Sequence, residues 1–338
     1  MAGIGTASFE ILIIVTPYFN AATTMAFVDP FRAANYLAGQ SMFRWSIASH
    51  EGGEVPTSSG LSVATEPIKS HHHKQPDLVV VSSSWTPEQY SSGLFNQALI
   101  RWSRNGAMLG ALDTGTFVLA KAGLLGGKRV TVHYEHIDAV IELFPDLDVS
   151  EDLFVIDGNV FTCCGGVASV DIALHLLRDI KGISLSNAVA RYIFHHDVRG
   201  PSATQNPKTI ETTGHITPSA VRRAVDLMEA NLETPLTIPE ICVRLNISQR
   251  QLSRLFKRYV RKSAALYYRD IRLDRARGLV TQTELKLSEV AVASGFNSQV
   301  HFSRAYNDRF GLPPRKDRIE GRVPFEFRAW PMHDPDHD

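Results

Sequence analysis

The chain has 338 residues, with 35 Lys and Arg matched by 35 Asp and Glu, and only 3 Cys. This length fits two domains that each bury a core. The few cysteines exclude a disulfide scaffold and favour a reducing, cytoplasmic location. Neither a signal-peptide pattern nor an apolar run of membrane-spanning length is present, so we expect no membrane partner.

The balanced total hides a strong segregation of charge along the chain. Residues 1–216 carry 14 basic and 20 acidic side chains, a net charge of −6. Residues 217–318 carry 19 basic and 10 acidic side chains, a net charge of +9. A compact basic segment favours a polyanionic partner, although a solvated basic surface would give the same count.

The first part of the chain alternates short apolar runs with longer amphipathic stretches. In chain order we expect a strand at 9–15, a helix at 21–37, a strand at 78–81, a helix between Pro87 and Arg104, and a strand at 107–112. This alternation predicts a mainly parallel, doubly wound α/β sheet of the flavodoxin-like kind. Ligands of such sheets bind beyond the carboxyl ends of the strands, here at residues 16–17, 82–85 and 113–115.

The composition also predicts where the domains meet. Residues 8–194 form the expected α/β domain, and residues 195–216, rich in Pro, Gly, Ser and Thr, form an expected linker. Residues 217–318 show helical periodicity and many Arg, which predicts an all-α domain. Residues 319–338 are an expected flexible tail.

The basic segment contains an internal repeat at an offset of fifty residues. Residues 248–256, SQRQLSRLF, align with residues 298–306, SQVHFSRAY. The two serines, the glutamine and the arginine recur identically, and the apolar positions stay apolar. Each copy therefore predicts the same unit, a short helix, a turn and a second helix.

The local signals in each copy fit a helix-turn-helix. Thr237 and Glu240 form a T-x-x-E capping box, and Ser248 is placed to cap the second helix. Inward-facing apolar residues of that helix leave polar side chains on its outer face, where they can reach bases in a major groove of double-stranded DNA. The candidate base contacts are Arg250, Ser253, Arg254, Gln299, His301 and Arg304, and the candidate phosphate contacts are Arg261, Lys262 and Arg315.

From about residue 235 to 318 the chain resembles the AraC/XylS family of transcription regulators. The resemblance rests on the stretches RLDRAR at 272–277, AVASGF at 291–296, HFSR at 301–304 and FGLPPR at 310–315. It implies two helix-turn-helix subdomains joined by a long helix, here at about 264–280. Where the family usually has Gly-x-Ser-Pro, this chain has RKSA at 261–264, which puts the geometry of that turn in question.

Residues 9–190 resemble the amidotransferase-like domain of the GlxA-type regulators, which is related to class I glutamine amidotransferases. The resemblance rests on DPFRAAN at 29–35, DTGTFVLAKAGLL at 113–125, HYE at 133–135 and TCCGG at 162–166. In the enzyme relatives a Cys occupies the position of Asp113. The resemblance therefore implies a fold reused for ligand binding, and we expect no enzyme activity.

The same strand end suggests what the domain binds. Asp113 offers a negative charge, Thr114 lies beside it, and Trp85 ends a neighbouring loop, so an ion pair and an aromatic face could hold a cation. A betaine, carnitine or a basic amino acid satisfies both. The alternative is that Trp85 only packs and that Asp113 only caps the next helix.

We expect neither a cofactor nor a metal ion. The histidines at 71–73 point in successive directions and are expected in an exposed loop, and Cys163 and Cys164 are expected to pack. The sequence therefore predicts a homodimeric, effector-responsive activator that contacts RNA polymerase. An amidase-like or hydrolase-like enzyme, and a constitutive DNA binder whose α/β domain only dimerises, remain alternatives.

Overall fold

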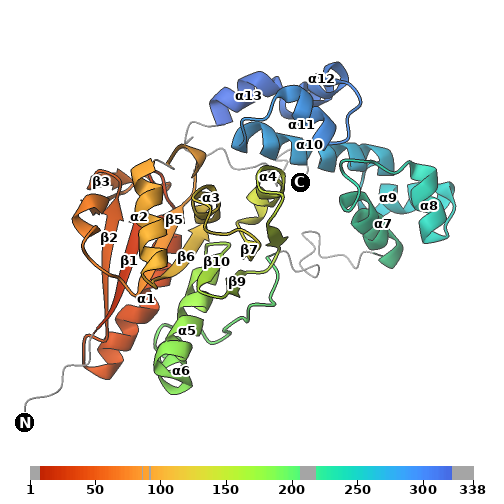
Figure 1. The fold of residues 1–338 in the computed structure, drawn as a ribbon. Helices are drawn as coiled ribbons and strands as arrows, with labels where there is room; N and C mark the ends of the chain where they lie inside the picture. Colours follow the sequence, from red (N-terminus) through yellow and green to blue (C-terminus); the bar gives the residue numbers. More distant parts are fainter. Residues whose placement is uncertain (1–7, 86, 91–92, 206–217, 322–338) are drawn as a thin grey trace, which may run out of the picture. The chain divides into compact units, whose positions relative to one another are not determined.

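A computed structural model describes residues 8–85, 87–90, 93–205 and 218–321 (Figure 1). The described residues divide into two compact units, residues 8–205 and residues 218–321. The first unit is the predicted α/β domain and the second is the predicted helical domain. Within the described residues, the helices are too short or too polar to cross a membrane.

The first unit is built on one eight-stranded sheet. Its strands, in spatial order, are β3 (Gly53–Pro56), β4 (Ser62–Pro67), β2 (Phe43–Ser49), β1 (Phe9–Val15), β5 (Leu78–Ser83), β6 (Met108–Asp113), β10 (Val160–Cys163) and β9 (Phe154–Asp157). Only the edge strands β3 and β9 pair antiparallel with their neighbours. A separate two-stranded sheet joins β7 (Arg129–Thr131) and β8 (Asp148–Ser150). The prediction of a mainly parallel sheet is confirmed.

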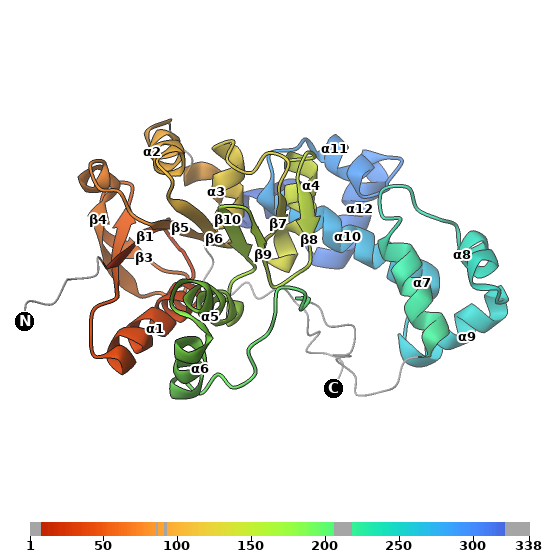
Figure 2. The same cartoon turned by 60° about the horizontal axis from the view of Figure 1, so that its bottom comes forward.

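Helices cover both faces of the sheet (Figure 2). One face carries α1 (Ala21–Ala38), α5 (Ala168–Lys181) and α6 (Ile183–Tyr192), and the other carries α2 (Gly93–Arg104) and α3 (Gly115–Lys121). Ile11 and Ile13 of β1 belong to the first core, whereas Leu12 and Ile14 belong to the second. Because strand side chains alternate between faces, the unbroken apolar run at 11–15 of β1 must be covered on both faces of the sheet. The doubly wound fold follows from that pattern.

The segment before β5 differs from the expected exposed loop. Ile68–His71 forms a short 3-10 helix, and His71 is only 1% exposed. Only the later part of the histidine run faces solvent, because His73 is exposed. The sequence reasoning missed the pairing of β2 with β4, which brings this segment against the sheet edge.

The first part of the expected linker is packed against the α/β unit. Asp171 of α5 is fully buried, and its carboxylate accepts hydrogen bonds from the backbone and guanidinium of Arg199 and lies 2.7 Å from His195 Nε2. Further along, Gln205 Nε2 donates to the Val132 carbonyl oxygen at 2.9 Å. The linker therefore begins later than residue 195, and the rest of its expected span, residues 206–217, lies outside the described residues.

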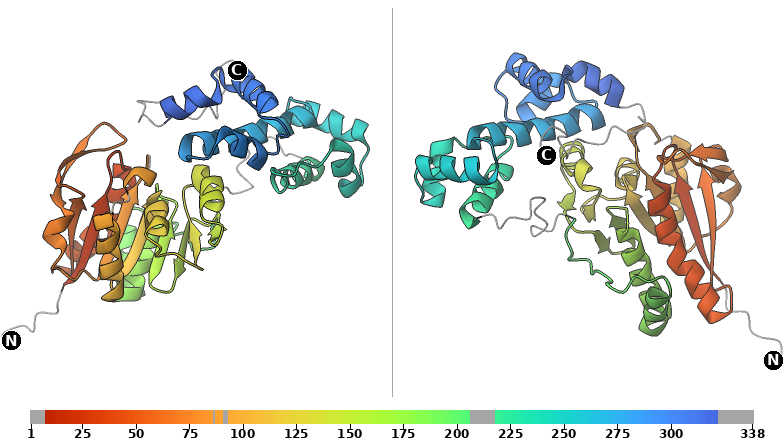
Figure 3. Two further views of the ribbon diagram at one scale, coloured as in Figure 1. Left: turned by 45° about the horizontal axis from the view of Figure 1, so that its top comes forward. Right: turned by 180° about the vertical axis from the view of Figure 1, so that it is seen from behind.

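The second unit contains seven described helices, among them the predicted long one. They are α7 (Ser219–Glu229), α8 (Ile238–Leu245), α9 (Gln249–Tyr259), α10 (Ala264–Gln282), α11 (Leu287–Ala293), α12 (Gln299–Phe310) and α13 (Pro314–Gly321). In Figure 3, α10 runs between the teal helices α7 to α9 and the blue helices α11 to α13. The expected tail from residue 319 begins within α13, and residues 322–338 lie outside the described residues.

The helical unit has two cores that share α10. Tyr268 belongs to the core of the first helix pair, with Leu252 and Phe256. Leu273 belongs to the core of the second pair, with Phe302. Each half of α10 therefore packs against one helix pair, and this single helix connects both pairs.

Candidate DNA interface and effector site

The first helix-turn-helix has the predicted local structure. The Thr237 hydroxyl and the Glu240 carboxylate form the reciprocal capping box at the start of α8. Asn246 ends α8 in the left-handed conformation with φ 54°, and Ser248 Oγ then caps α9 by accepting from the Gln251 N–H at 3.2 Å. Asn tolerates this backbone conformation well. The short turn therefore follows from Asn246 and Ser248 together.

The second helix-turn-helix makes its longer turn with glycine. Gly295 has φ +72°, and an added Cβ there would lie 2.4 Å from the Leu232 carbonyl oxygen. Only glycine avoids both the conformational strain and that contact. Ser298 begins α12 as in the first copy, but its side chain makes no capping bond. Residues 294–298 therefore separate α11 from α12, whereas only residues 246–248 separate α8 from α9.

The six candidate base contacts all lie on the exposed sides of the second helix of each pair. They are Arg250, Ser253 and Arg254 on α9, and Gln299, His301 and Arg304 on α12. Leu252 and Phe256 of α9, and Phe302 and Tyr306 of α12, are buried on the opposite faces. Both helices thus present polar side chains outward, the arrangement that a groove-reading helix requires, and Arg254 and Arg304 occupy equivalent positions of the repeat.

The three candidate phosphate contacts differ from one another. Arg261 and Arg315 are exposed. Lys262 is exposed as well, but its Nζ lies 2.9 Å from Asp270 Oδ2. An ammonium held by a carboxylate is less available to phosphate than a free one. Of the three, Arg261 and Arg315 are the stronger candidates.

Arg261 occupies a strained position. Its φ is +61°, in the left-handed region that favours glycine, which is what the family pattern has in this turn. We expect Arg261→Gly to stabilise the helical unit by about 1 kcal/mol, because glycine removes the steric cost. Urea unfolding followed by circular dichroism checks this. Asn246→Gly is the matched control: its φ is 54°, but Asn already tolerates that conformation, so little gain is expected and an equal gain would contradict the strain argument.

A group of ion pairs braces the two helix pairs against each other. Arg309 of α12 lies 3.1 Å from Asp270 and 2.7 Å from Asp274, both on α10. Asp270 is also the carboxylate that holds Lys262, which follows α9. The two halves of the unit are therefore linked by charge as well as by the shared helix.

Part of the net charge of this unit is used for packing rather than presented to solvent. Arg272 stacks over the Phe296 ring at 4.4 Å, and Arg277 Nε donates to the buried Asp317 at 2.8 Å. Arg318 donates to the carbonyl oxygens of Val280 and Leu285. The RLDRAR stretch thus holds the helices together. The positive charge that a polyanion would meet at the surface is therefore smaller than the net charge of +9 indicates.

In the α/β unit, the loops after β1, β5 and β6 converge as predicted. Thr16 Oγ1 lies 2.8 Å from Ser83 Oγ, and Thr114 Oγ1 donates to the Ser84 carbonyl oxygen at 2.7 Å. Asp113 sits at the sharp turn from β6 to α3 with φ 59°. A strained residue at a strand-to-helix turn is common at functional sites. Asp113 therefore lies in a strained turn at the carboxyl end of β6.

The Asp113 carboxyl lies in an unusual electrostatic environment. It is 5% exposed, and burial raises its pKa to about 6, while the nearby His133 and hydrogen bonds with Ser84 and Asn20 act in the opposite direction. Glu135 adds to the rise. A buried carboxyl with this raised pKa is a candidate for recognising a positive charge.

The other predicted residues at this edge are placed as follows. Trp85 lies two residues beyond β5 and is 38% exposed, so its ring is available at the surface rather than buried beside Asp113. Cys163 and Cys164 are both buried, as expected for packing residues. Burial raises the pKa of the Cys163 thiol well above its usual value, which disfavours a nucleophilic thiolate.

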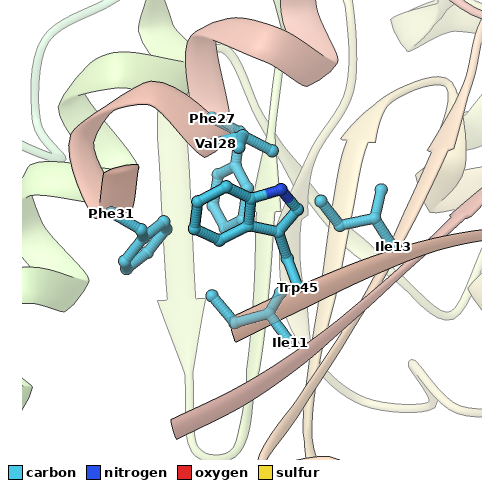
Figure 4. Close-up of a pocket in the computed structure, with 6 residues that line it drawn as sticks. All are labelled: Ile11, Ile13, Phe27, Val28, Phe31 and Trp45. Atoms are coloured by element: carbon cyan, nitrogen blue, oxygen red, sulfur yellow. The ribbon is translucent and has the colours of Figure 1, made fainter. Parts of the chain in front are cut away.

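A small hollow between α1 and the sheet is apolar and carries no such chemistry. Figure 4 shows the Trp45 indole lying between α1 and β1; the hollow is lined by Ile11, Ile13, Phe27, Val28, Phe31 and Trp45. It is too tight for a water molecule, and its lining is hydrophobic. This hollow is a packing feature, and the polar edge at Asp113 is the better candidate for a ligand.

Comparisons with known proteins match both units. A model of the DJ-1/PfpI family matches residues 10–179, and a model of a helix-turn-helix domain matches residues 241–319. The HTH-type transcriptional regulator CdhR of Pseudomonas aeruginosa is 36% identical over 315 residues, covering 92% of this chain and 92% of the relative. The regulator GlxA of Rhizobium meliloti is 34% identical over 286 residues, covering 85% and 88%. The chain belongs to the GlxA-type transcriptional regulators of the AraC/XylS family.

A solved structure agrees with the fold of about half of this regulator. The crystal structure of an AraC family transcriptional regulator from Pseudomonas putida superposes with a TM-score of 0.50 and 23% identity, covering 55% of this chain and 99% of that one. The resemblance inferred from the motifs in both halves of the regulator is confirmed.

Sequence reasoning missed some residues of the regulator that lie near Asp113. Asn20 caps α1 through Oδ1 and also reaches the Asp113 carboxyl. His136 follows the recognised HYE stretch, and burial lowers its pKa to about 3. The spacing of His133, Glu135 and His136 in the sequence indicates that their side chains can lie close together, because residues three apart in a helical turn lie on one side.

Proposed function

We propose that this protein is a sequence-specific, DNA-binding transcription activator whose α/β unit senses a small nitrogenous metabolite. In this proposal α9 and α12 enter successive major-groove segments of one duplex face. The α/β unit also forms the homodimer, and the assembly contacts RNA polymerase in the cytoplasm. Family membership supports the role in transcription. The effector, the dimer and the direction of regulation are inferences of our own.

The observation that carries the proposal is that α9 and α12, the second helices of the two repeats, both expose polar side chains and both belong to helix pairs that pack against α10. Arg254 and Arg304 occupy equivalent repeat positions, and both are exposed. The 19 residues of α10 span about 28 Å at the rise of an α-helix. That length is comparable with the roughly 34 Å between major-groove segments on one face of DNA. The spacing of the two pairs therefore suits one duplex.

The two reading helices differ at one equivalent position. Arg250 on α9 aligns with Val300 on α12, and Val300 is 75% exposed. An arginine fork suits guanine O6 and N7, whereas an apolar side chain suits the methyl group of thymine. We expect the half-site under α9 to contain guanine and that under α12 to contain thymine at this position.

Base reading by Arg254 makes a definite prediction. Arg254→Ala should weaken binding to the preferred site by about 1–3 kcal/mol and relax its specificity, because a contact with a base edge is lost. Fluorescence anisotropy with preferred and scrambled duplexes at physiological salt measures this.

Arg315→Ala is the matched control, since Arg315 is an exposed candidate phosphate contact. It should weaken both duplexes alike and lower the salt dependence of binding. If Arg254→Ala also weakens both duplexes equally, then Arg254 does not read a base. If the wild-type protein shows no preference between duplexes, the proposed function itself is wrong.

The chemistry of the Asp113 edge supports a cationic effector. A buried carboxyl gains from an opposite charge, and the hydrogen bonds of Thr16 with Ser83 and of Thr114 with the Ser84 carbonyl oxygen fix the loops around it. Trp85 offers an exposed aromatic face at the same edge. Betaines, carnitine and basic amino acids combine a cation with this size. These are the effectors that we propose.

Thermal-shift screening of those compounds tests the effector role. A ligand at 100 times its dissociation constant should stabilise the protein by about 2.7 kcal/mol. Asp113→Asn should remove the shift, whereas Cys163→Ala should keep it. Turnover of an active compound that depends on Cys163 would favour the enzyme alternative, and a screen without any shift would favour a constitutive binder.

A further inference from the structure

A group of three potential metal ligands lies beside the proposed effector edge. His133, Glu135 and His136 each offer one ligand atom, and these atoms all lie within 4.8 Å of one another. It is the one such group found among the residues that the structure describes. The histidine run at 71–73, for which the sequence predicts no metal ion, is a different segment of the chain.

The local fold brings the three side chains together. His133 follows the end of β7, and Tyr134–His136 forms a single 3-10 turn closed by a bond from the His136 N–H to the His133 carbonyl oxygen at 2.8 Å. The Glu135 carboxylate then lies 3.8 Å from His133 Nδ1. The Phe117 ring packs edge-on against the His136 imidazole with centroids 5.9 Å apart. The turn and this aromatic contact limit how the ligands can move.

One nitrogen in the group lacks a partner. His136 Nδ1 is buried from solvent and has no hydrogen-bond partner among the described residues. Buried polar atoms in folded proteins are nearly always satisfied, and a bound ion is one way to satisfy a ring nitrogen. This nitrogen is a second observation, independent of the clustering, that points to a ligand.

We propose that His133, Glu135 and His136 bind one divalent transition-metal ion of the Zn²⁺ class. Two imidazoles and one carboxylate are a donor set that such ions take, with bonds of about 2.0–2.2 Å. A tetrahedral ion with such bonds holds its ligand atoms about 3.3 Å apart. Side-chain rotations that move the ligand atoms by about 1 Å therefore bring them to bonding distance of one ion. Three protein ligands leave a fourth position open. This proposal does not depend on the effector assignment.

Metal binding by the full-length protein tests the proposal directly. Protein stripped with a chelator is titrated with Zn²⁺ in competition with a chromophoric chelator, and the bound metal is counted by elemental analysis after desalting. We expect one tightly bound ion per chain. Co²⁺ in place of Zn²⁺ should give visible absorption bands of a four- or five-coordinate ion, which reports the ligand geometry without any substitution.

Variants identify the ligands. His136→Asn and Glu135→Gln should each weaken Zn²⁺ binding by about tenfold or more. Glu135 is partly exposed, so Glu135→Gln keeps the test valid if His136→Asn fails to fold. The control is His50→Gln, because His50 Nδ1 and Glu51 form a similar pair at 2.7 Å that is not part of a three-ligand group. Unchanged affinity in the two ligand variants, an equal loss in His50→Gln, or no bound ion in the wild type would each overturn the proposal.

Discussion

Arg199→Ala should destabilise the α/β unit by about 3–5 kcal/mol, toward the lower end of that range. The guanidinium of Arg199 donates two hydrogen bonds to Asp171, whose side chain is fully buried. Without Arg199, the partners that this carboxylate keeps among the described residues are His195 and the backbone N–H of residue 199. A buried charge that loses its main partner costs far more than a surface pair contributes.

Urea unfolding followed by tryptophan fluorescence measures this loss, because Trp45, Trp85 and Trp102 all belong to the α/β unit. The control is Arg129→Ala: Arg129 also forms a pair, at 2.8 Å from Asp152, but its side chain is 54% exposed. We expect that loss to be below about 1 kcal/mol. Similar losses in both variants would mean that Asp171 does not depend on its ion pair.

Asp113→Asn should stabilise the α/β unit at pH 8 by about 3 kcal/mol. Burial raises the pKa of Asp113 to about 6, so folding favours its protonated form. The stabilisation that a protonated Asp113 provides is complete below the unfolded pKa near 4 and is lost as the pH rises through about 6. Asn is always neutral and accepts φ 59°, so it avoids this cost at high pH.

The gain from Asp113→Asn should therefore shrink as the pH falls from 8 toward 4. The measurement is urea unfolding across that range in the presence of a chelator, which keeps metal ions away from His133 and Glu135, two groups that act electrostatically on Asp113. Asp148→Asn, at an exposed position, should change little. A gain that is the same at every pH would show that the charge of Asp113 costs nothing in the fold.

The regular elements were predictable because their signals are local. The mostly apolar run at 9–15, in which Glu10 is the one charged residue, and the T-x-x-E box at Thr237 each determine structure within a few residues; β1 has the expected bounds, and Thr237 caps α8 as expected. The outward position of Arg254 follows from the same helical periodicity. The alignment of residues 248–256 with residues 298–306 then predicts a second helix pair like the first.

What could not be predicted depends on contacts between distant segments. The composition of residues 195–205 is that of a linker, but Asp171 lies 24 residues before His195 and holds it by tertiary contact. The sequence predicts a phosphate contact for Lys262, but the hydrogen bond from its Nζ to Asp270 forms only in the folded chain. Near Asp113, Asn20 and Glu135 come from different parts of the chain and meet only after the sheet has formed.

The shared helix α10 has a consequence for the operator. Because its two halves belong to two separate cores and Arg309 ties α12 back to it, the two reading helices are held at one separation and one relative rotation. A base pair inserted between the two contacted segments changes both distance and angle on the duplex. The promoters that this protein serves should therefore keep an invariant spacer, and adaptation to new promoters should proceed by substitution rather than by insertion or deletion.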